Sequence, residues 1–362
     1  MKKLRLSHSG LSKFQDCPKS FDFHYNKRIV SRYKGSSLYF GSALDLAINE
    51  LLTGKDLETA EDVFIKNWTI GKDNDYSEIE LMENEDIVYS ATDFDKDLIQ
   101  DEEEIFDEDY YNEISEKKST NGWPNLKSKE RKYYNKWNWL SLKNKGIMLL
   151  QVYKEQLLPK FKKVLAIQKQ VELKNDDGDS IIGYVDLIAE LHDGRIAVID
   201  NKTAGREYDL DAVTKSPQLS LYKTILNSGD EFNVDVAAFA VLIKQLNKNV
   251  KKTCMSCDFK ADKGSTHKTC YNEINKKRCG GDWKREIEFE GRSQFLLDEI
   301  PEAVQEMVLE NINVINHSIK NDIYPRNFNN CKTKYGTLCP YFQKCWYGKE
   351  DDLIQLPKKK EE

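Results

Sequence analysis

Two carboxylates and a lysine stand close together in an apolar stretch of the sequence. Asp186 interrupts one apolar run, and the next run ends on Asp200 and Lys202. The turn dipeptide Asp193-Gly194 joins the two runs, a pattern typical of a β-hairpin. Because side chains alternate between the two faces of a strand, Asp200 and Lys202 are expected on the same face. The pattern therefore predicts that two acids and a lysine converge.

This combination of residues suits metal-assisted hydrolysis of a phosphodiester. Carboxylate oxygens bind divalent cations such as Mg²⁺, and a lysine beside the cation can orient or deprotonate an attacking water. The alternative is an ordinary hairpin whose charges face solvent. The runs around Asp186 and Asp200 are too apolar for a half-exposed strand, and a buried carboxylate needs a partner or an ion. The context therefore favours a metal site.

The flanking sequence predicts an α/β core that would position these residues. Runs of β-branched and apolar residues predict strands over 164–173, 181–190, 195–202, 234–245 and 283–290. Apolar residues at helical spacing predict two short helices on either side of Cys17-Pro18, and longer ones over 36–52, 140–158, 216–227 and 292–318. Strands and helices therefore alternate in the second half of the chain, as in α/β folds.

The charge of the chain is unevenly distributed. All 362 residues, enough for one large or two modest domains, carry a net charge of −6. Residues 73–116 hold 19 Asp and Glu and one Lys, so the remainder carries +12. We expect this acidic block to be a variable helical insertion with a disordered part. The basic remainder suits a polyanionic partner such as DNA.

The sequence contains no signal for a membrane. No apolar run approaches the roughly 18–20 residues that span a bilayer, and the first residues lack the apolar stretch of a signal peptide. We therefore expect no membrane partner and a cytoplasmic location, which would be the host cytoplasm for a viral protein.

Eight cysteines fall into two groups of four, and the first group is local. Cys254, Cys257, Cys270 and Cys279 lie in a polar segment of fewer than thirty residues. Such a segment has little core of its own, so tetrahedral zinc ligation by four thiolates is the expected way for it to fold. His267 is an alternative ligand to Cys270. Free thiols in a loose loop are the other interpretation.

The second group is dispersed over the two ends of the chain. It consists of Cys17, Cys331, Cys339 and Cys345, and both Cys17 and Cys339 are followed by proline. Aromatic residues around the last two would shield an iron–sulfur cluster from water. Taken alone, these residues leave three alternatives open: zinc, an iron–sulfur cluster and unligated buried cysteines.

Together these stretches resemble the PD-(D/E)XK nuclease superfamily, and within it the RecB-like branch that includes the CRISPR-adaptation exonucleases. The resemblance covers most of the chain and rests on the order of its motifs. These are Ser9-Gly-Leu-Ser-Lys-Phe-Gln-Asp-Cys17-Pro with the terminal cysteines, Gly41-Ser-Ala-Leu-Asp45, Gly183-Tyr-Val-Asp186, Asp200-Asn-Lys202, and Gln218-Leu-Ser-Leu-Tyr222.

The resemblance implies a restriction-endonuclease-like fold, with a central mixed β-sheet flanked by helices, to which a small zinc-binding insert is added. It also implies that Asp186 and Asp200 bind Mg²⁺ or Mn²⁺, helped by the backbone carbonyl of Asn201. Lys202 would position the attacking water and stabilise charge on the phosphate.

Three further positions take their roles from the resemblance. Gln218 and Tyr222 would orient the metal or the DNA. Asp45 stands where the family has a histidine metal ligand, so an oxygen ligand is kept and a negative charge is added. This departure predicts an altered metal preference or a weakened activity.

The resemblance also implies a structural 4Fe-4S cluster on Cys17, Cys331, Cys339 and Cys345, which would hold the two ends of the chain together. Seven residues separate Cys331 from Cys339, where the family commonly has two. Cys331 is therefore the ligand with the weakest support in the sequence.

These observations divide the chain into five predicted parts. They are an N-terminal helical part over 1–72, the acidic insertion over 73–139, the nuclease core over 140–250, a zinc-ribbon-like insert over 251–283, and the C-terminal strand, helix and cysteine motif over 284–362.

The predicted function is a metal-dependent DNA nuclease, an exonuclease on single strands or duplex ends in recombination, repair or viral replication. The sequence has no phosphate-binding Gly-x-x-x-x-Gly-Lys-Ser/Thr loop, so any unwinding would come from a helicase or another recombination or replication partner. One alternative is a catalytically weakened nuclease fold that serves as a DNA-binding or complex-forming subunit. A second is a zinc-containing interaction protein whose acidic block binds basic partners.

Overall fold

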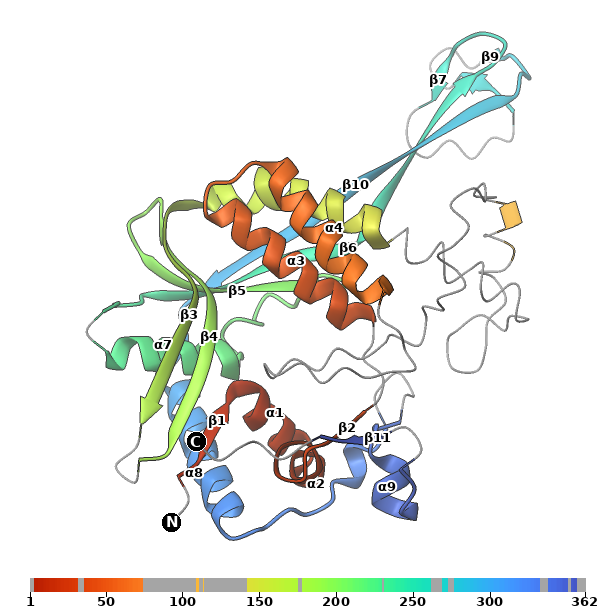
Figure 1. The fold of residues 1–362 in the computed structure, drawn as a ribbon. Helices are drawn as coiled ribbons and strands as arrows, with labels where there is room; N and C mark the ends of the chain where they lie inside the picture. Colours follow the sequence, from red (N-terminus) through yellow and green to blue (C-terminus); the bar gives the residue numbers. More distant parts are fainter. Residues whose placement is uncertain are drawn as a thin grey trace.

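A computed structural model describes residues 3–31, 36–73, 109–110, 113, 142–174, 178–229, 231–261, 269–272, 277–332, 338–350 and 353–356. In these ranges a mixed sheet of seven strands forms the centre of the molecule (Figure 1). Its strands are β1 (Arg5–Ser7), β3 (Phe161–Lys174), β4 (Ser180–Leu191), β5 (Ile196–Ala204), β6 (Val236–Cys254), β7 (Lys260–Ala261) and β10 (Trp283–Asp298).

The strand directions follow from the connections between the strands. A tight turn joins β4 to β5, and these two strands are antiparallel. Helix α7 (Pro217–Ser228) connects β5 to β6, which run parallel, because a crossover helix returns the chain to the same edge. The Ser216 hydroxyl caps α7 by accepting a hydrogen bond from the Leu219 N–H at 3.2 Å, and Pro217 occupies the first turn. The mixed sheet flanked by helices confirms the predicted α/β class and fits a restriction-endonuclease-like fold.

Helices cover both faces of the sheet (Figure 1). One face carries α3 (Ser36–Leu52), α4 (Leu57–Asp73) and a helix over 142–152. The other carries α1 (His8–Asp16), α7 and α8 (Glu302–Lys320). The remaining helical segments are α2 (Pro18–Phe21), η1 (Asp22–Asn26), η3 (Tyr153–Leu157), η4 (Leu158–Lys160), η5 (Phe328–Asn330) and α9 (Phe342–Tyr347).

Alternation along the central strands fills two separate cores. In β6, Phe239 and Val241 belong to the core beneath α7 and α8, whereas Ala238 and Leu242 belong to the core beneath α3 and α4. Because both faces are buried, the central strands are nearly continuous apolar runs. Any charged residue in them therefore needs a specific partner.

The N-terminal and C-terminal segments pack together beside the sheet. Strand β2 (Ile29–Ser31) pairs with β11 (Leu353–Gln355), and the Tyr341 hydroxyl donates to the Ile29 carbonyl at 3.0 Å. A small core of Phe23, Ile29, Tyr341 and Leu353 lies between them. Cys339 and Cys345 pack against this core, so the terminal cysteines lie where the two ends meet.

Strands β6 and β10 continue beyond the sheet as a two-stranded arm (Figure 1). Its tip carries β7, β8 (Tyr271–Asn272) and β9 (Lys277–Arg278). The prediction that β6 ends at residue 245 was wrong, because its pairing with β10 continues to Cys254.

The predicted helix over 292–318 was wrong in its first part. Strand β10 runs on to Asp298, and α8 begins only at Glu302. Leu296 packs in one core while Phe295 and Leu297 pack against the other, which is the period of a strand. The predicted acidic insertion falls almost entirely on 74–108 and 114–141, outside the described residues, as does His267. In the part of the chain that the structure describes, no helix is both long and apolar enough to cross a bilayer.

Candidate active site

Asp186 and Asp200 face each other where β4 and β5 separate. The ladder between these strands ends at the pair Leu187 and Ile199, and the two acids occupy the next positions. The N–H of Asn201 donates to Asp186 Oδ2 at 2.8 Å, although it lies in a strand. The two carboxyls are close enough for the charge of Asp200 to raise the pKa of Asp186. The end of the ladder thus brings both carboxyls to one point.

Lys202, Asp200 and Gln218 form a closed ring of polar contacts. Lys202 Nζ lies 2.5 Å from Asp200 Oδ2 and donates to Gln218 Oε1 at 3.1 Å. Gln218 Nε2 donates to Asp200 Oδ1 at 2.8 Å and also lies 3.2 Å from the Tyr222 hydroxyl oxygen. One turn of α7 separates Gln218 from Tyr222, so both reach the site from one helix face. Each ring member therefore fixes the orientation of the other two.

Asp45 reaches the site from α3, on the opposite side of the sheet edge from α7. Its Oδ2 accepts a hydrogen bond from Gln168 Nε2 at 3.0 Å. Gln168 lies in β3 with φ of 47°, which is a strained conformation for a residue other than glycine. The neighbouring pairs Ile167–Leu187 and Lys169–Val185 put Gln168 beside Asp186 in the register. The strained backbone therefore belongs to the residue whose side chain donates a hydrogen bond to Asp45.

Gly183 has a steric reason to be glycine. A Cβ at this position would lie 2.5 Å from Tyr222 Cε1, closer than real Cβ contacts come. The ring of Tyr222, which is 4% exposed, packs directly on the backbone of β4. At Gly41, by contrast, a Cβ would meet only Thr203 Oγ1 at 3.7 Å, an ordinary contact.

Burial and mutual repulsion raise the pKa values of the three acids. Burial, followed by the charges of Asp200 and Asp45, raises the pKa of Asp186 to about 8. Burial and Asp200 raise the pKa of Asp45 to about 6. Burial raises the pKa of Asp200 despite its ion pair with Lys202. Three carboxyls therefore share one lysine in a place with little solvent.

This donor set fits a divalent cation. Hard cations such as Mg²⁺ and Mn²⁺ prefer oxygen ligands, and a positive ion would relieve the repulsion among the three acids. The side-chain Oδ1 of Asn201 accepts a hydrogen bond from the buried Tyr153 hydroxyl at 3.1 Å. This contact engages the amide oxygen, so the backbone carbonyl is the group of Asn201 that we expect to contribute to a metal site.

Lys202 keeps its charge at neutral pH. Burial lowers the pKa of its ammonium, but the charge and hydrogen bond of Asp200 outweigh burial and raise that pKa above its ordinary value. A protonated Lys202 is a hydrogen-bond donor and a cation, which suits contact with a phosphate or a water.

Three residues around the site were not predicted from the sequence: Gln168, Tyr153 and His8. The ring of His8, the first residue of α1, lies edge-on to Tyr222 at 6.5 Å between centroids. Burial and the charge of Lys202 lower the pKa of His8 to about 4, so it is neutral at pH 7. None of the three carries a spacing signal in the sequence, since their roles depend on strand register and helix packing.

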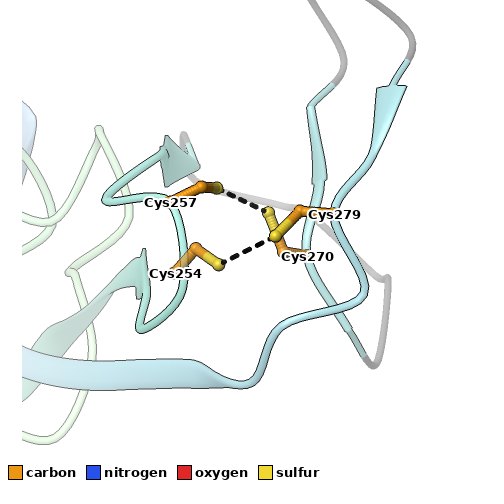
Figure 2. Close-up of side chains that lie close together, drawn as sticks. All are labelled: Cys254, Cys257, Cys270 and Cys279. Atoms are coloured by element: carbon orange, nitrogen blue, oxygen red, sulfur yellow. Dashed lines mark hydrogen bonds between the residues drawn. The ribbon is translucent and has the colours of Figure 1, made fainter.

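The first cysteine group converges at the tip of the arm. Figure 2 shows the four sulfurs of Cys254, Cys257, Cys270 and Cys279 turned toward one another. All four lie within 4.8 Å of each other, with Sγ–Sγ distances of 3.8 Å for Cys254–Cys279 and 3.7 Å for Cys257–Cys270. Thiolates placed 2.3 Å from a tetrahedral zinc ion would be about 3.8 Å apart. We call this group the cysteine knuckle.

The second cysteine group also comes together, with wider spacing. Cys17 lies between α1 and α2, and the N–H of Cys339 donates to the Cys331 carbonyl at 2.9 Å. Burial, with smaller contributions from Cys17 and Cys331, raises the pKa values of Cys339 and Cys345. Among the described residues, only the cysteine knuckle has its sulfurs within 4.8 Å of one another. The terminal four are therefore not spaced for a single tetrahedral ion.

A fold with a mixed sheet, and a site with acids at a strand separation followed by a lysine, define a class of metal-dependent enzymes. Comparison with family models matches the PD-(D/E)XK nuclease superfamily over residues 5–345. The chain belongs to this superfamily.

Other comparisons add little to that assignment. No curated protein matches the chain. One solved structure, described as the crystal structure of SSO0001, is 14% identical over a match that covers 51% of this chain and 65% of that chain, with a TM-score of 0.23. The match thus spans less than two thirds of that chain.

Proposed function

We propose that the protein is a DNA nuclease that depends on Mg²⁺ or Mn²⁺. The observation that carries the proposal is the polar ring of Asp200, Lys202 and Gln218 beside two further acids, Asp186 and Asp45. A purely structural ion pair would need one acid for one lysine. Here one lysine cannot neutralise three carboxyls, which is why they hold their protons more tightly, and a divalent cation can replace these protons and balance the charge of the acids.

In this proposal, Asp186, Asp200 and the carbonyl of Asn201 hold the metal, and Asp45 supplies a further oxygen. When bound, the metal polarises the phosphate and lowers the pKa of water. Lys202 orients the attacking water and donates to the phosphate oxygen on which charge develops. It acts as a charged donor, since its raised pKa disfavours loss of a proton to become a base.

Gln218 and Tyr222 act as positioning residues. Gln218 contacts the carboxylate and the ammonium at once, so it keeps Lys202 aimed beside the metal ligands. Tyr222, wedged against Gly183, limits the movement of Gln218. This rigidity matters because catalytic groups lose rate steeply when misplaced by about 1 Å.

We further propose that DNA is the substrate and that the enzyme is an exonuclease on single strands or duplex ends, in recombination, repair or viral replication. The charge of +12 outside residues 73–116 supports a polyanionic substrate. A helicase or another recombination or replication protein is the proposed partner, and the cytoplasm of a cell or host the proposed location.

The two cysteine groups are proposed to hold different metals. The spacing of the cysteine knuckle fits a structural Zn²⁺. Cys17, Cys331, Cys339 and Cys345, whose sulfurs do not all lie within 4.8 Å of one another, are proposed to hold a 4Fe-4S cluster, in which the thiolates bind separate irons. Anaerobically purified protein is expected to be brown and to contain one zinc per chain; colourless protein with two zinc ions would assign zinc to both groups.

The alternative is a DNA-binding subunit with weakened catalysis, and Asp45 favours it. This acid adds negative charge to a site that already carries an excess. The test is degradation of end-labelled single-stranded and duplex DNA with Mg²⁺ or Mn²⁺, using Lys202→Ala and Asp200→Ala, with the exposed Lys163→Ala as control. We expect cleavage by the control and none by the site variants. DNA binding without cleavage under either metal would favour the alternative.

A further inference from the structure

The arm connects the cysteine knuckle to the candidate active site through a single strand. In β6, Val241 pairs with Lys202 of β5, and the same strand runs on for thirteen residues to Cys254. At about 3.3 Å per residue, this distance is roughly 40 Å. The pairing of β6 with β10 extends from Ala237 to Cys254 with one irregularity at Glu290 and Arg292, so the arm is supported along its length.

Positive charge is concentrated at the tip of the arm. Up to the pair Lys252–Arg285, the described residues 252–261, 269–272 and 277–285 contain six Lys and Arg and two Asp. Four thiolates around one Zn²⁺ add a charge of −2, which leaves the tip positive in a chain whose net charge is −6. The base of the arm differs, because Glu286, Glu288 and Glu290 lie there on β10. A polyanion is therefore favoured at the tip rather than along the ribbon.

The tip also presents exposed side chains. Met255 is 71% exposed, and Lys260, which pairs with Thr253 in β7, is exposed as well. Lys277 and Arg278 form β9 opposite Asn272 and Tyr271. The short strands that carry Lys260, Lys277 and Arg278 lie next to the cysteine knuckle, so a bound zinc ion would fix the backbone at these positions and reduce the entropy lost on binding phosphates.

From these observations we propose that the cysteine knuckle binds the phosphate backbone of duplex DNA about one helical turn away from the bond that the active site cleaves. The proposal rests on the proposed nuclease function. A distance of roughly 40 Å corresponds to about 12 base pairs at 3.4 Å each. Duplex DNA is stiff over this length, so a duplex held at one site reaches the other, whereas a flexible single strand is not held straight.

The test compares two duplex lengths in the full-length protein. The triple variant Lys260→Ala/Lys277→Ala/Arg278→Ala removes three charges from the tip. The control Lys55→Ala/Lys154→Ala/Lys160→Ala removes three exposed lysines from the body. Binding is measured by fluorescence anisotropy with Ca²⁺ in place of Mg²⁺, on blunt duplexes of about 8 and about 30 base pairs.

We expect the tip variant to bind the long duplex at least about tenfold more weakly, with a salt dependence flatter by about 2 to 3 in the log–log slope. It should bind and cleave the short duplex like the wild type, and the body control should match the wild type on both lengths. No loss on the long duplex would overturn the proposal and point to a protein as the occupant of the tip. Equal loss on both lengths would also overturn it, because the tip residues would then contact DNA close to the cleaved bond.

Folding of the tip is checked separately. The zinc content of the triple variant should equal that of the wild type. If it does not, the single variant Lys260→Glu, at an exposed position, is used in place of the triple variant. The expected dependence on duplex length, and the results that would overturn the proposal, are the same for this variant. Failure of the proposed function itself has a different signature. Wild-type protein would then cleave neither duplex with Mg²⁺ or Mn²⁺, while the anisotropy comparison would still report whether the tip binds DNA.

Discussion

Metal binding at the candidate active site should compete with protons. Without metal, the pKa of Asp186 is raised to about 8 and that of Asp45 to about 6. At pH 7 about one Asp186 in ten is ionised, so displacing its proton weakens metal binding about tenfold, or about 1.4 kcal/mol. At pH 6 the factor for Asp186 is about 100, and Asp45 adds a further factor of about 2. The dissociation constant for Mn²⁺ should therefore rise about 100-fold between pH 8 and pH 6.

Isothermal titration calorimetry with Mn²⁺, in two buffers of different ionisation enthalpy, measures both affinity and proton release. About one proton should be released at pH 7, and between one and two at pH 6. Asp45→Asn should reduce proton release at both pH values, because it removes the proton of Asp45 itself at pH 6 and removes a charge that raises the pKa of Asp186. Asp193→Asn, in the exposed hairpin turn, is the matched control and should behave as the wild type. An affinity that is constant from pH 6 to pH 8, without proton release, would refute the reasoning.

Three further predictions follow from the same contacts. Folding raises the pKa values of Asp45 and Asp186, so the protonated acids stabilise the folded protein at low pH, and this stabilisation is lost as the pH rises through 6 to 8. The melting temperature of metal-free protein should therefore fall over this range. Added Mn²⁺ should restore it. Gln168→Ala should weaken Mn²⁺ binding about fivefold, because the hydrogen bond to Asp45, worth about 1 kcal/mol, is lost. Gln168→Gly should lose the same affinity but unfold at a higher temperature than Gln168→Ala, since glycine relieves the positive φ. Equal melting temperatures of the two variants would contradict the backbone strain at Gln168. Gly183→Ala should destabilise the protein by about 1 to 3 kcal/mol by displacing Tyr222, whereas Gly41→Ala, in the interior of α3, should be neutral or stabilising by up to about 1 kcal/mol in denaturant unfolding.

Spacing in the sequence predicted that Asp186, Asp200 and Lys202 converge, whereas Gln218, Tyr222 and Asp45 were predicted from the resemblance to the nuclease superfamily. Asp200 and Lys202 lie two apart on a strand, and Gln218 and Tyr222 lie four apart on a helix, so each pair shares a face in the structure. The cysteine knuckle was predictable for a similar reason, since a short polar segment with four cysteines has few ways to fold.

Other features depend on tertiary contacts that no local pattern records. Gln168 carries no sequence signal for a left-handed backbone, and its role arises only where β3 lies beside Asp45. Phe295, Leu296 and Leu297 are consecutive apolar residues, which a helix or a doubly buried strand would both accommodate. The pairing of β10 with the full length of β6 decided between them, and it also produced the arm.

The most direct test of the central claim is cleavage of end-labelled DNA by full-length protein with Mg²⁺ or Mn²⁺, before and after a single change at Lys202. Lys202→Ala removes the ammonium that lies 2.5 Å from Asp200 and leaves the three acids in place. Metal-dependent cleavage by the wild type and by Lys163→Ala, with none by Lys202→Ala, is the predicted result. Equal cleavage by Lys202→Ala and the wild type would contradict the assignment of this site as the nuclease centre.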